Sequence, residues 1–195
     1  LRDKAVLLNW QYEPDVDESR TALVASTGAA QYVCPAVHCW DALLPRIDTA
    51  WANISRMAAY GAAHRAEGIL VTDWGDYGHV NDPVMSLPGL CYGAQCGWNG
   101  GGDCGQAAVD RAIDRLEYGV EDGFVDALRQ ASACTTFGWD DAVRYLELDM
   151  HAYDHADHRP VLNGDVAAFC DVCVGSGPAE RVADAADVRQ ARRRL

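Results

Sequence analysis

The fold is decided by the stretch Gly68-Ile69-Leu70-Val71-Thr72-Asp73-Trp74-Gly75-Asp76-Tyr77-Gly78-His79. Its first five residues form a short apolar run, which is typical of a strand buried on both faces of a parallel sheet. Polar and aromatic residues follow at once, together with two glycines that allow sharp turns. A buried strand that ends in such a loop predicts an α/β protein whose site lies at the C-terminal edge of the sheet.

The same pattern occurs twice earlier in the chain. Residues 5–10 and 31–37 are short apolar runs that we interpret as buried strands. Helical periodicity follows at 17–26, 48–63 and 89–98, each time after a strand and its loop. Strand, loop and helix in repetition predict right-handed βαβ units in a parallel sheet.

The glycine-rich turn at 99–103 marks a change in pattern. The sequence predicts one domain over residues 1–99 and a helical region over residues 104–195. Within the second region, helices are predicted at 107–116, 123–133 and 140–148.

Composition excludes several classes of protein. The chain has 195 residues, a net charge of −13 and 49% hydrophobic residues, which is a globular composition. The acidity argues against nucleic acid or an anionic membrane as a partner, because both attract basic proteins. No stretch approaches the roughly 20 apolar residues of a membrane span.

Eight cysteines are present, and most have apolar or small neighbours, as reduced structural thiols do. The chain begins without a signal-peptide pattern, so we expect a cytoplasmic protein. The lone pair Cys170 and Cys173, and the histidines His151, His155 and His158, lack the spacing of a standard metal site. We therefore predict no metal and no cofactor.

The strand-end loops share tryptophans and hydrogen-bonding groups, a combination that suits a sugar. Aromatic rings pack on the apolar face of a pyranose, and charged side chains bind its hydroxyls. The alternative for any single tryptophan is core packing, which we expect for Trp51, Trp98 and Trp139. The structural alternatives are a cap on backbone amides for Asp73 and a bond to a loop carbonyl for His79. They suit these two residues better than Trp74 and Asp76. The predicted substrate-binding residues are Trp10, Tyr12, Trp40, Asp41, Asp73, Trp74, Asp76 and His79.

Several motifs together resemble glycoside hydrolase family 20, the β-N-acetylhexosaminidases. They are Asn9-Trp10-x-Tyr12, Trp40-Asp41-x-Leu43-x-Pro45-Arg46, Asn53-Ile54, Thr72-Asp73-Trp74-Gly75-Asp76-x-Gly78-His79, Tyr92-Gly93-Ala94 and Trp98-Asn99. The likeness covers roughly residues 5 to 150. It implies a partial (β/α)8 TIM barrel, consisting of the last three or so βα units, followed by an α-helical C-terminal region. The earlier strands of the barrel would then be missing from this chain.

The resemblance also implies an activity: hydrolysis of terminal N-acetylhexosamine residues by a retaining mechanism in which the substrate's acetamido group attacks. Trp74 and Trp10 would wall the acetamido pocket, and Asp76 would bind sugar hydroxyls. Trp40 and Asp41 would come from the penultimate strand, where the family commonly places a tyrosine.

The family's catalytic Asp-Glu pair has no counterpart here. Asp17-Glu18 and Glu121-Asp122 read as solvated charges at helix ends, since neither pair follows a buried strand. The expected function is thus that of a hexosaminidase fragment that is inactive alone. The alternatives are a carbohydrate-binding α/β module without catalysis and a structural fragment whose tryptophans only pack. Linkage, sugar configuration and oligomeric state stay open.

Overall fold

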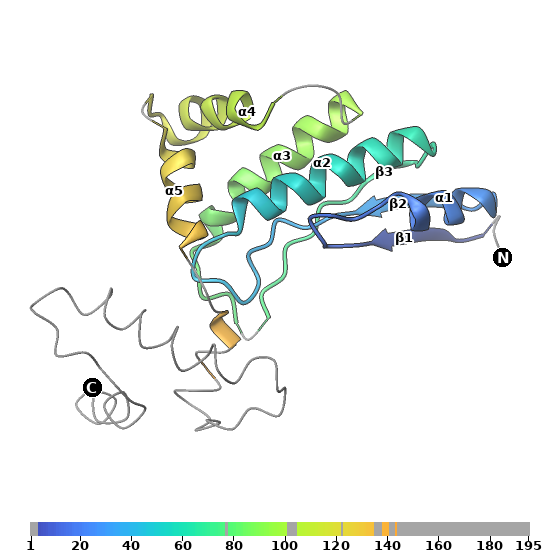
Figure 1. The fold of residues 1–195 in the computed structure, drawn as a ribbon, viewed down its shortest axis with the longest axis horizontal. Coiled ribbons are helices and arrows are strands. Elements are labelled where there is room, and N and C mark those ends of the chain that lie inside the picture. The colour runs from blue at the N-terminus through green and yellow to red at the C-terminus, as the bar shows by residue number, and fades with distance from the viewer. Residues whose placement is uncertain are drawn as a thin grey trace, which may run out of the picture. The chain divides into compact units, whose positions relative to one another are not determined.

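The computed structural model describes residues 4–76, 78–100, 105–121, 123–134, 138–140 and 143 (Figure 1). Its strands are β1 (Val6–Trp10), β2 (Ala30–Cys34) and β3 (Gly68–Ile69). Its helices are α1 (Ser19–Ser26), α2 (Ile47–Ala63), α3 (Leu87–Asn99), α4 (Gln106–Ile113) and α5 (Phe124–Ala133), with two short helical turns, η1 (Pro83–Ser86) and η2 (Asp114–Tyr118). Each strand lies inside a segment predicted as a strand or overlaps it closely, and the helices follow the predicted periodicity. The predicted helix at 140–148, the Cys170/Cys173 pair and the three C-terminal histidines lie largely or wholly outside the described residues.

The three strands form one parallel sheet in the order β1-β2-β3. Leu8 pairs with Tyr32, and Tyr32 in turn pairs with Gly68. A further bridge between Ala36 and Thr72 carries the pairing beyond the ends of β2 and β3. The parallel order puts the C-terminal ends of all three strands at one edge, as the βαβ rhythm predicts.

Helices cover one face of this sheet (Figure 1). On that face, the buried side chains of Asn9 and Gln31 donate hydrogen bonds to Thr21 of α1, at 3.0 Å each. Val33 and Met57 form a small core between β2 and α2. One-sided cover of this kind leaves the alternate residues of each strand pointing the other way.

The opposite face of the sheet is apolar and exposed. Side chains of β1 keep 51% (Val6), 57% (Leu8) and 60% (Trp10) of their surface in solvent, and Leu70 keeps 46%. The prediction that the first strand is fully buried is therefore wrong. The same prediction for the third segment is wrong at Leu70. The strand does have apolar residues on both faces, but it lies at the sheet's edge and the described helices cover only one side.

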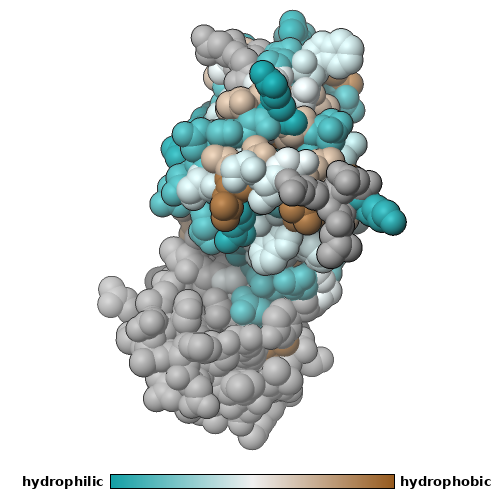
Figure 2. Space-filling model, turned by 90° about the vertical axis from the view of Figure 1, so that its right-hand side faces the viewer, coloured by the Kyte–Doolittle hydropathy of each residue, from teal (hydrophilic) through white to brown (hydrophobic). Residues whose placement is uncertain are grey.

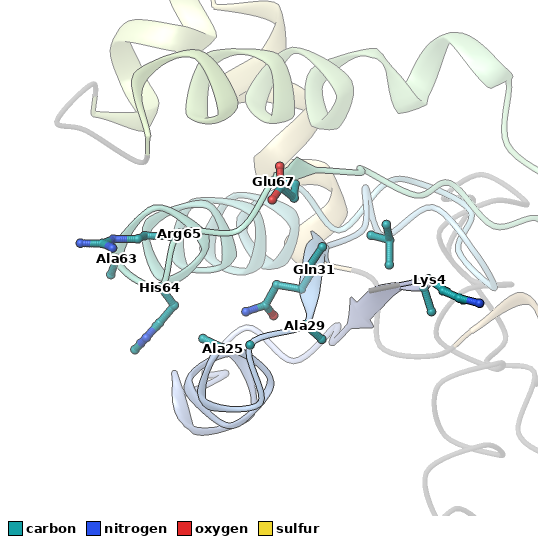
Figure 3. A pocket seen from close by; sticks show the side chains of 12 residues that line it. Lys4, Ala25, Ala29, Gln31, Ala63, His64, Arg65 and Glu67 are labelled. Carbon is teal, nitrogen blue, oxygen red and sulfur yellow. The ribbon is translucent and has the colours of Figure 1, made fainter. Parts of the chain in front are cut away.

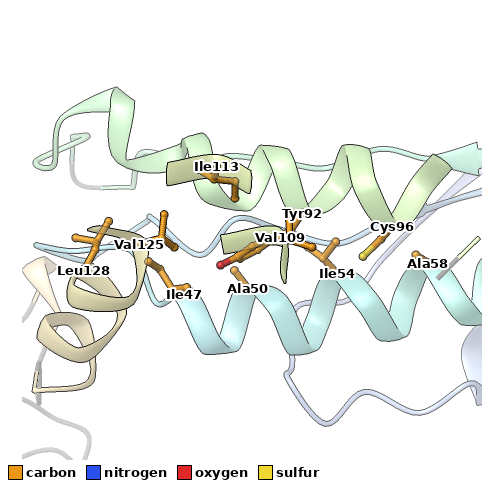
Figure 4. Close-up of a cluster of buried hydrophobic side chains, with 10 residues drawn as sticks. All are labelled: Ile47, Ala50, Ile54, Ala58, Tyr92, Cys96, Val109, Ile113, Val125 and Leu128. Carbon is orange, nitrogen blue, oxygen red and sulfur yellow. The ribbon is translucent and has the colours of Figure 1, made fainter. Parts of the chain in front are cut away.

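The main core lies between α2 and α3 and extends to α4 and α5 (Figure 4). Ile54, Tyr92 and Val125 are fully buried in it, with Val109 from α4 beside them. Contacts group the chain into a compact unit that ends at Cys134 and a second that starts at Thr135. This boundary differs from the one predicted near residue 100, because α4 and α5 bury their apolar faces against α2 and α3.

Glycines on one face of α3 allow it to lie directly on the sheet side of the unit. A Cβ at Gly93 would be 2.2 Å from Cγ2 of Val71, and one at Gly89 would be 2.6 Å from Cβ of Val37. Real atoms do not approach so closely, so a larger residue at either position would force the helix or the facing valine to move. The small-residue pattern of this segment thus sets how near α3 stands to the strands.

The three tryptophans expected to pack differ in outcome, and Trp139 is partly buried. Trp51 meets Tyr92 edge-to-face, with ring centroids 5.1 Å apart, and the packing prediction is confirmed. Trp98 keeps 91% of its surface exposed, so the same prediction is wrong there. The buried residues of α3 include Gly89, Tyr92 and Cys96, and Trp98 lies on the opposite side of the helix.

In the described part of the chain, no helix has both the length and the apolar character needed to cross a bilayer.

Candidate functional site

A cavity of about 780 Å³ lies where the C-terminal ends of the three strands meet the loops that follow them. This size falls within the range of small-molecule sites. The residues that line it are Leu8, Trp10, Tyr12, Cys34, Trp40, Leu70, Thr72, Trp74 and Asp76. All three strand-end loops contribute, so the parallel topology brings together clusters that are far apart in sequence.

Tyr12 is the centre of the aromatic wall. Its ring centroid lies 5.6 Å from that of Trp10 and 5.2 Å from that of Trp40, with interplanar angles of 41° and 47°. The indole Nε1 of Trp74 donates a hydrogen bond of 2.7 Å to the Tyr12 hydroxyl. Tilted contacts and one strong hydrogen bond hold the four rings as a connected group.

Strand residues contribute an apolar part of the cavity wall. Leu8 and Leu70 are half exposed, and Cys34 lies between them in the sheet order. Burial raises the pKa of the Cys34 thiol, which keeps it protonated and makes it a poor nucleophile. The two leucines therefore offer contact surface, and the buried thiol of Cys34 offers no reactive group.

Buried asparagines hold the loops that form the cavity. Asn53 of α2 is fully buried; its Nδ2 donates to the carbonyls of Gln11 (2.9 Å) and Glu13 (3.1 Å), and its Oδ1 accepts from the Ala36 amide (3.1 Å). Asn81 likewise donates to the carbonyls of Cys39 and Ala42, in the loop that follows β2. Bonds to buried backbone groups fix these loops because leaving such groups unpaired is costly.

The buried ring of His38 packs against the ring of Trp40, which lines the cavity. Its backbone has a φ of 60°, its side chain is 3% exposed, and its ring centroid lies 4.6 Å from that of Trp40. Burial, helped by the nearby Arg46 guanidinium, lowers the pKa of His38 to about 4. The ring is therefore neutral near pH 7 and acts as a packing element.

Five of the eight predicted site residues line the cavity: Trp10, Tyr12, Trp40, Trp74 and Asp76. Trp10 and Trp74 keep 60% and 47% of their surface exposed, so their rings are open to a ligand. Asp76 is also exposed, and it is the cavity's single carboxylate among the described residues that line it.

The other three predicted residues lie outside the cavity lining. Asp41 has a φ of 50°, and its carbonyl accepts a bond from Arg46. Asp73 accepts a 2.5 Å bond from the Ser86 hydroxyl and stands 3.5 Å from Nε2 of His79. Nδ1 of His79 is 3.2 Å from the Asn81 carbonyl. His79 thus meets a loop carbonyl, as the structural alternative for it has it. Asp73 accepts from a side-chain hydroxyl and not from the backbone amides that its structural alternative named.

Sequence reasoning missed Leu8, Cys34, Leu70 and Thr72 as parts of the cavity. A signal for most of them exists, because side chains of an extended chain alternate between two faces. Leu8, Trp10 and Tyr12 are two residues apart, and so are Leu70, Thr72, Trp74 and Asp76. Counting back two residues at a time from Trp10 leads to Leu8, and counting back from Trp74 leads to Thr72 and Leu70.

A second cavity of similar volume lies at the opposite end of the strands (Figure 3). Gln31, His64 and Arg65 are among the residues that line it, and none of the predicted site residues does. Nε2 of Gln31 donates to the Thr21 carbonyl, whereas its buried Oε1 has no hydrogen-bond partner among the described residues. His64 lies 3.1 Å from Glu18. Figure 2 shows this end as a mainly hydrophilic surface with small, separate apolar patches. It lacks the aromatic wall of the first cavity.

The described residues contain no group of three or more His, Cys, Asp or Glu side chains placed to hold a metal ion. Comparisons with protein families, with curated proteins and with solved structures find no match.

Proposed function

We propose that this chain forms the carbohydrate-binding wall of a glycoside hydrolase of the β-N-acetylhexosaminidase type. One observation carries the proposal: Trp10, Tyr12, Trp40 and Trp74 surround one cavity together with the carboxylate of Asp76. Exposed indole rings supply flat apolar surface for a sugar ring, and a carboxylate accepts hydrogen bonds from its hydroxyls. The position at the C-terminal ends of parallel strands is where α/β folds place their ligands.

The exposed face of the sheet supports the accompanying proposal that these strands are part of a larger barrel. Sheets of this parallel kind normally have both faces covered and read as continuous apolar strands. Here Val6 and Leu8 are apolar yet half exposed, and β1 and β3 are both edge strands. Further strands beside β1 and β3 would bury these side chains in a barrel interior.

A carbohydrate-binding module without catalysis is the second candidate, and one observation favours it. Asp76 is the single carboxylate on the described lining, whereas glycosidases typically place two carboxyl groups at the scissile bond. With one, the cavity can hold a sugar but lacks an acid and base pair.

Titration with N-acetylglucosamine, followed by tryptophan fluorescence, tests the proposal. Trp98→Phe is a suitable background, because Trp98 is 91% exposed on α3 and would add a signal that no ligand changes. We expect a saturable change that Trp74→Phe reduces, since this variant loses both indole surface and the bond to Tyr12. No response from folded protein would refute carbohydrate binding.

Incubation with an aryl N-acetylglucosaminide separates the two candidates. Binding without release of the aryl group supports the module or an incomplete site. Release that depends on Asp76 would instead support a complete enzyme.

A further inference from the structure

A groove of about 370 Å³ lies between α3 and the segment formed by α4 and η2, away from the aromatic cavity. The two helical segments lie side by side (Figure 1) and share the main core. Most of the side chains that line the groove are apolar, among them Cys91, Ala94, Trp98, Ala112, Ile113 and Leu116. The proposed function makes no use of this surface.

Two large apolar side chains border the groove and are almost fully in solvent. Trp98 of α3 keeps 91% of its surface exposed, and Leu116 of η2 keeps 79%. Between them, Ala94 and Ala112 are too small to fill the groove. A protruding indole beside an apolar hollow is typical of a protein-binding surface, where tryptophan is among the residues that contribute most to affinity.

Charge around the groove suits a second copy of this acidic chain. No residue of α3 is charged, and the exposed charged side chains of α4 and η2 are Arg111, Arg115 and Glu117. Asp110 and Asp114 of the same segment are buried and accept hydrogen bonds within the core. Two copies that each carry a net charge of −13 repel each other least where such a surface faces itself.

We propose that this groove joins two copies of the chain in a two-fold dimer, in which Trp98 of each copy enters the groove of the other. A two-fold interface pairs one surface with itself, so it needs a protruding group and a hollow on the same patch. Trp98 and the groove that it borders supply both. This inference does not depend on the proposed function.

Sedimentation velocity of the whole chain over about 1 to 300 µM measures the association. We expect a reversible equilibrium between monomer and dimer. The dimer should become tighter between about 0.05 M and about 0.5 M salt, because salt screens the repulsion between two acidic chains. Indole emission should shift to shorter wavelength as the dimer forms, since Trp98 then leaves water.

Two variants remove the two halves of the contact. Trp98→Ala should weaken the dimer at least about 100-fold, because each dimer loses two buried indoles. Ala94→Arg keeps Trp98 but places a long charged side chain in the groove, and it should weaken the dimer as well. Trp10→Ala is the matched control, because it removes another exposed indole, on the sheet. Circular dichroism checks that each variant is folded.

A mixture of Trp98→Ala and Ala94→Arg separates this arrangement from other dimers. The first variant keeps an open groove and the second keeps Trp98, so a mixed pair retains one of the two insertions. We expect the mixture to associate at least about tenfold more tightly than either variant alone.

A chain that stays monomeric throughout this range would overturn the inference. Dissociation of the dimer by Trp10→Ala would overturn it too, because the sheet would then be the interface. So would a mixture that associates no better than the separate variants. None of these outcomes bears on the sugar titration, so the proposed function is tested separately.

Discussion

Asn53→Ala removes the side chain that holds two of the cavity's loops to α2. The Ala36 amide then has no partner in a buried site, which costs about 1–3 kcal/mol. The carbonyls of Gln11 and Glu13 also lose a donor, but water can reach them in part, so together they add roughly 1 kcal/mol. We expect the free energy of unfolding to fall by roughly 2–4 kcal/mol.

Urea denaturation followed by circular dichroism measures this loss. Ser55→Ala is the matched control, because Ser55 lies on the same helix and bonds only to the Ala52 carbonyl one turn earlier. We expect the control to change stability by less than about 0.5 kcal/mol. A loss below about 1 kcal/mol for Asn53→Ala would show that these bonds do not hold the loops. Unchanged sugar binding by the folded variant would show that the cavity does not depend on them.

Three further predictions concern pH and packing. Burial lowers the pKa of His38 from 6.5 to about 4. Between these two pH values, His38 is protonated in the unfolded chain and neutral in the folded protein. The free energy of unfolding should fall by up to about 3 kcal/mol as the pH drops from 6.5 to about 4. In His38→Asn, whose new residue tolerates positive φ, the urea midpoint should depend less on pH over this range. If the variant and the parent show the same pH dependence, the assignment to His38 is refuted. Gly93→Ala should cost at least about 1–3 kcal/mol in thermal or urea unfolding, whereas Gly105→Ala, with open space around its Cβ, should stay within about 0.5 kcal/mol; equal effects would mean that α3 shifts freely. Burial raises the pKa of Asp110, so the folded state holds its proton longer than the unfolded chain, and this contribution to stability is lost as the pH rises above 3.8 through the folded pKa. Asp110→Asn keeps an acceptor for the buried Tyr92 hydroxyl, so its stability relative to the parent should rise with pH over this window; a difference independent of pH would count against a perturbed carboxyl.

Local patterns in the sequence suffice for much of the fold. Short apolar runs locate the strands, three-and-four periodicity locates α2, and the parallel order follows because each strand is followed by a helix. This order also explains why Trp10, Trp40 and Trp74, which are far apart in the chain, line one cavity.

What the sequence could not supply depends on contacts between distant segments. The sequence favours a structural role for Asp73 over Asp76, but it does not identify the Ser86 hydroxyl as the group that Asp73 binds. Nothing local distinguishes Asn53 from other helix residues, because its partners lie on loops 17 to 42 residues away. The exposure of β1 likewise follows from which faces the helices cover, and an apolar run is the same whether or not a second layer exists.

The exposed apolar side of the sheet also decides which methods can follow the protein's folding. Dyes that brighten on contact with apolar surface are meant to report molten or unfolded chains. Val6, Leu8 and Leu70 would bind such a dye while the chain is still native. A dye-based melting curve would then start bright and lose its baseline, so the intrinsic signals of the backbone and of the indoles are the ones to record.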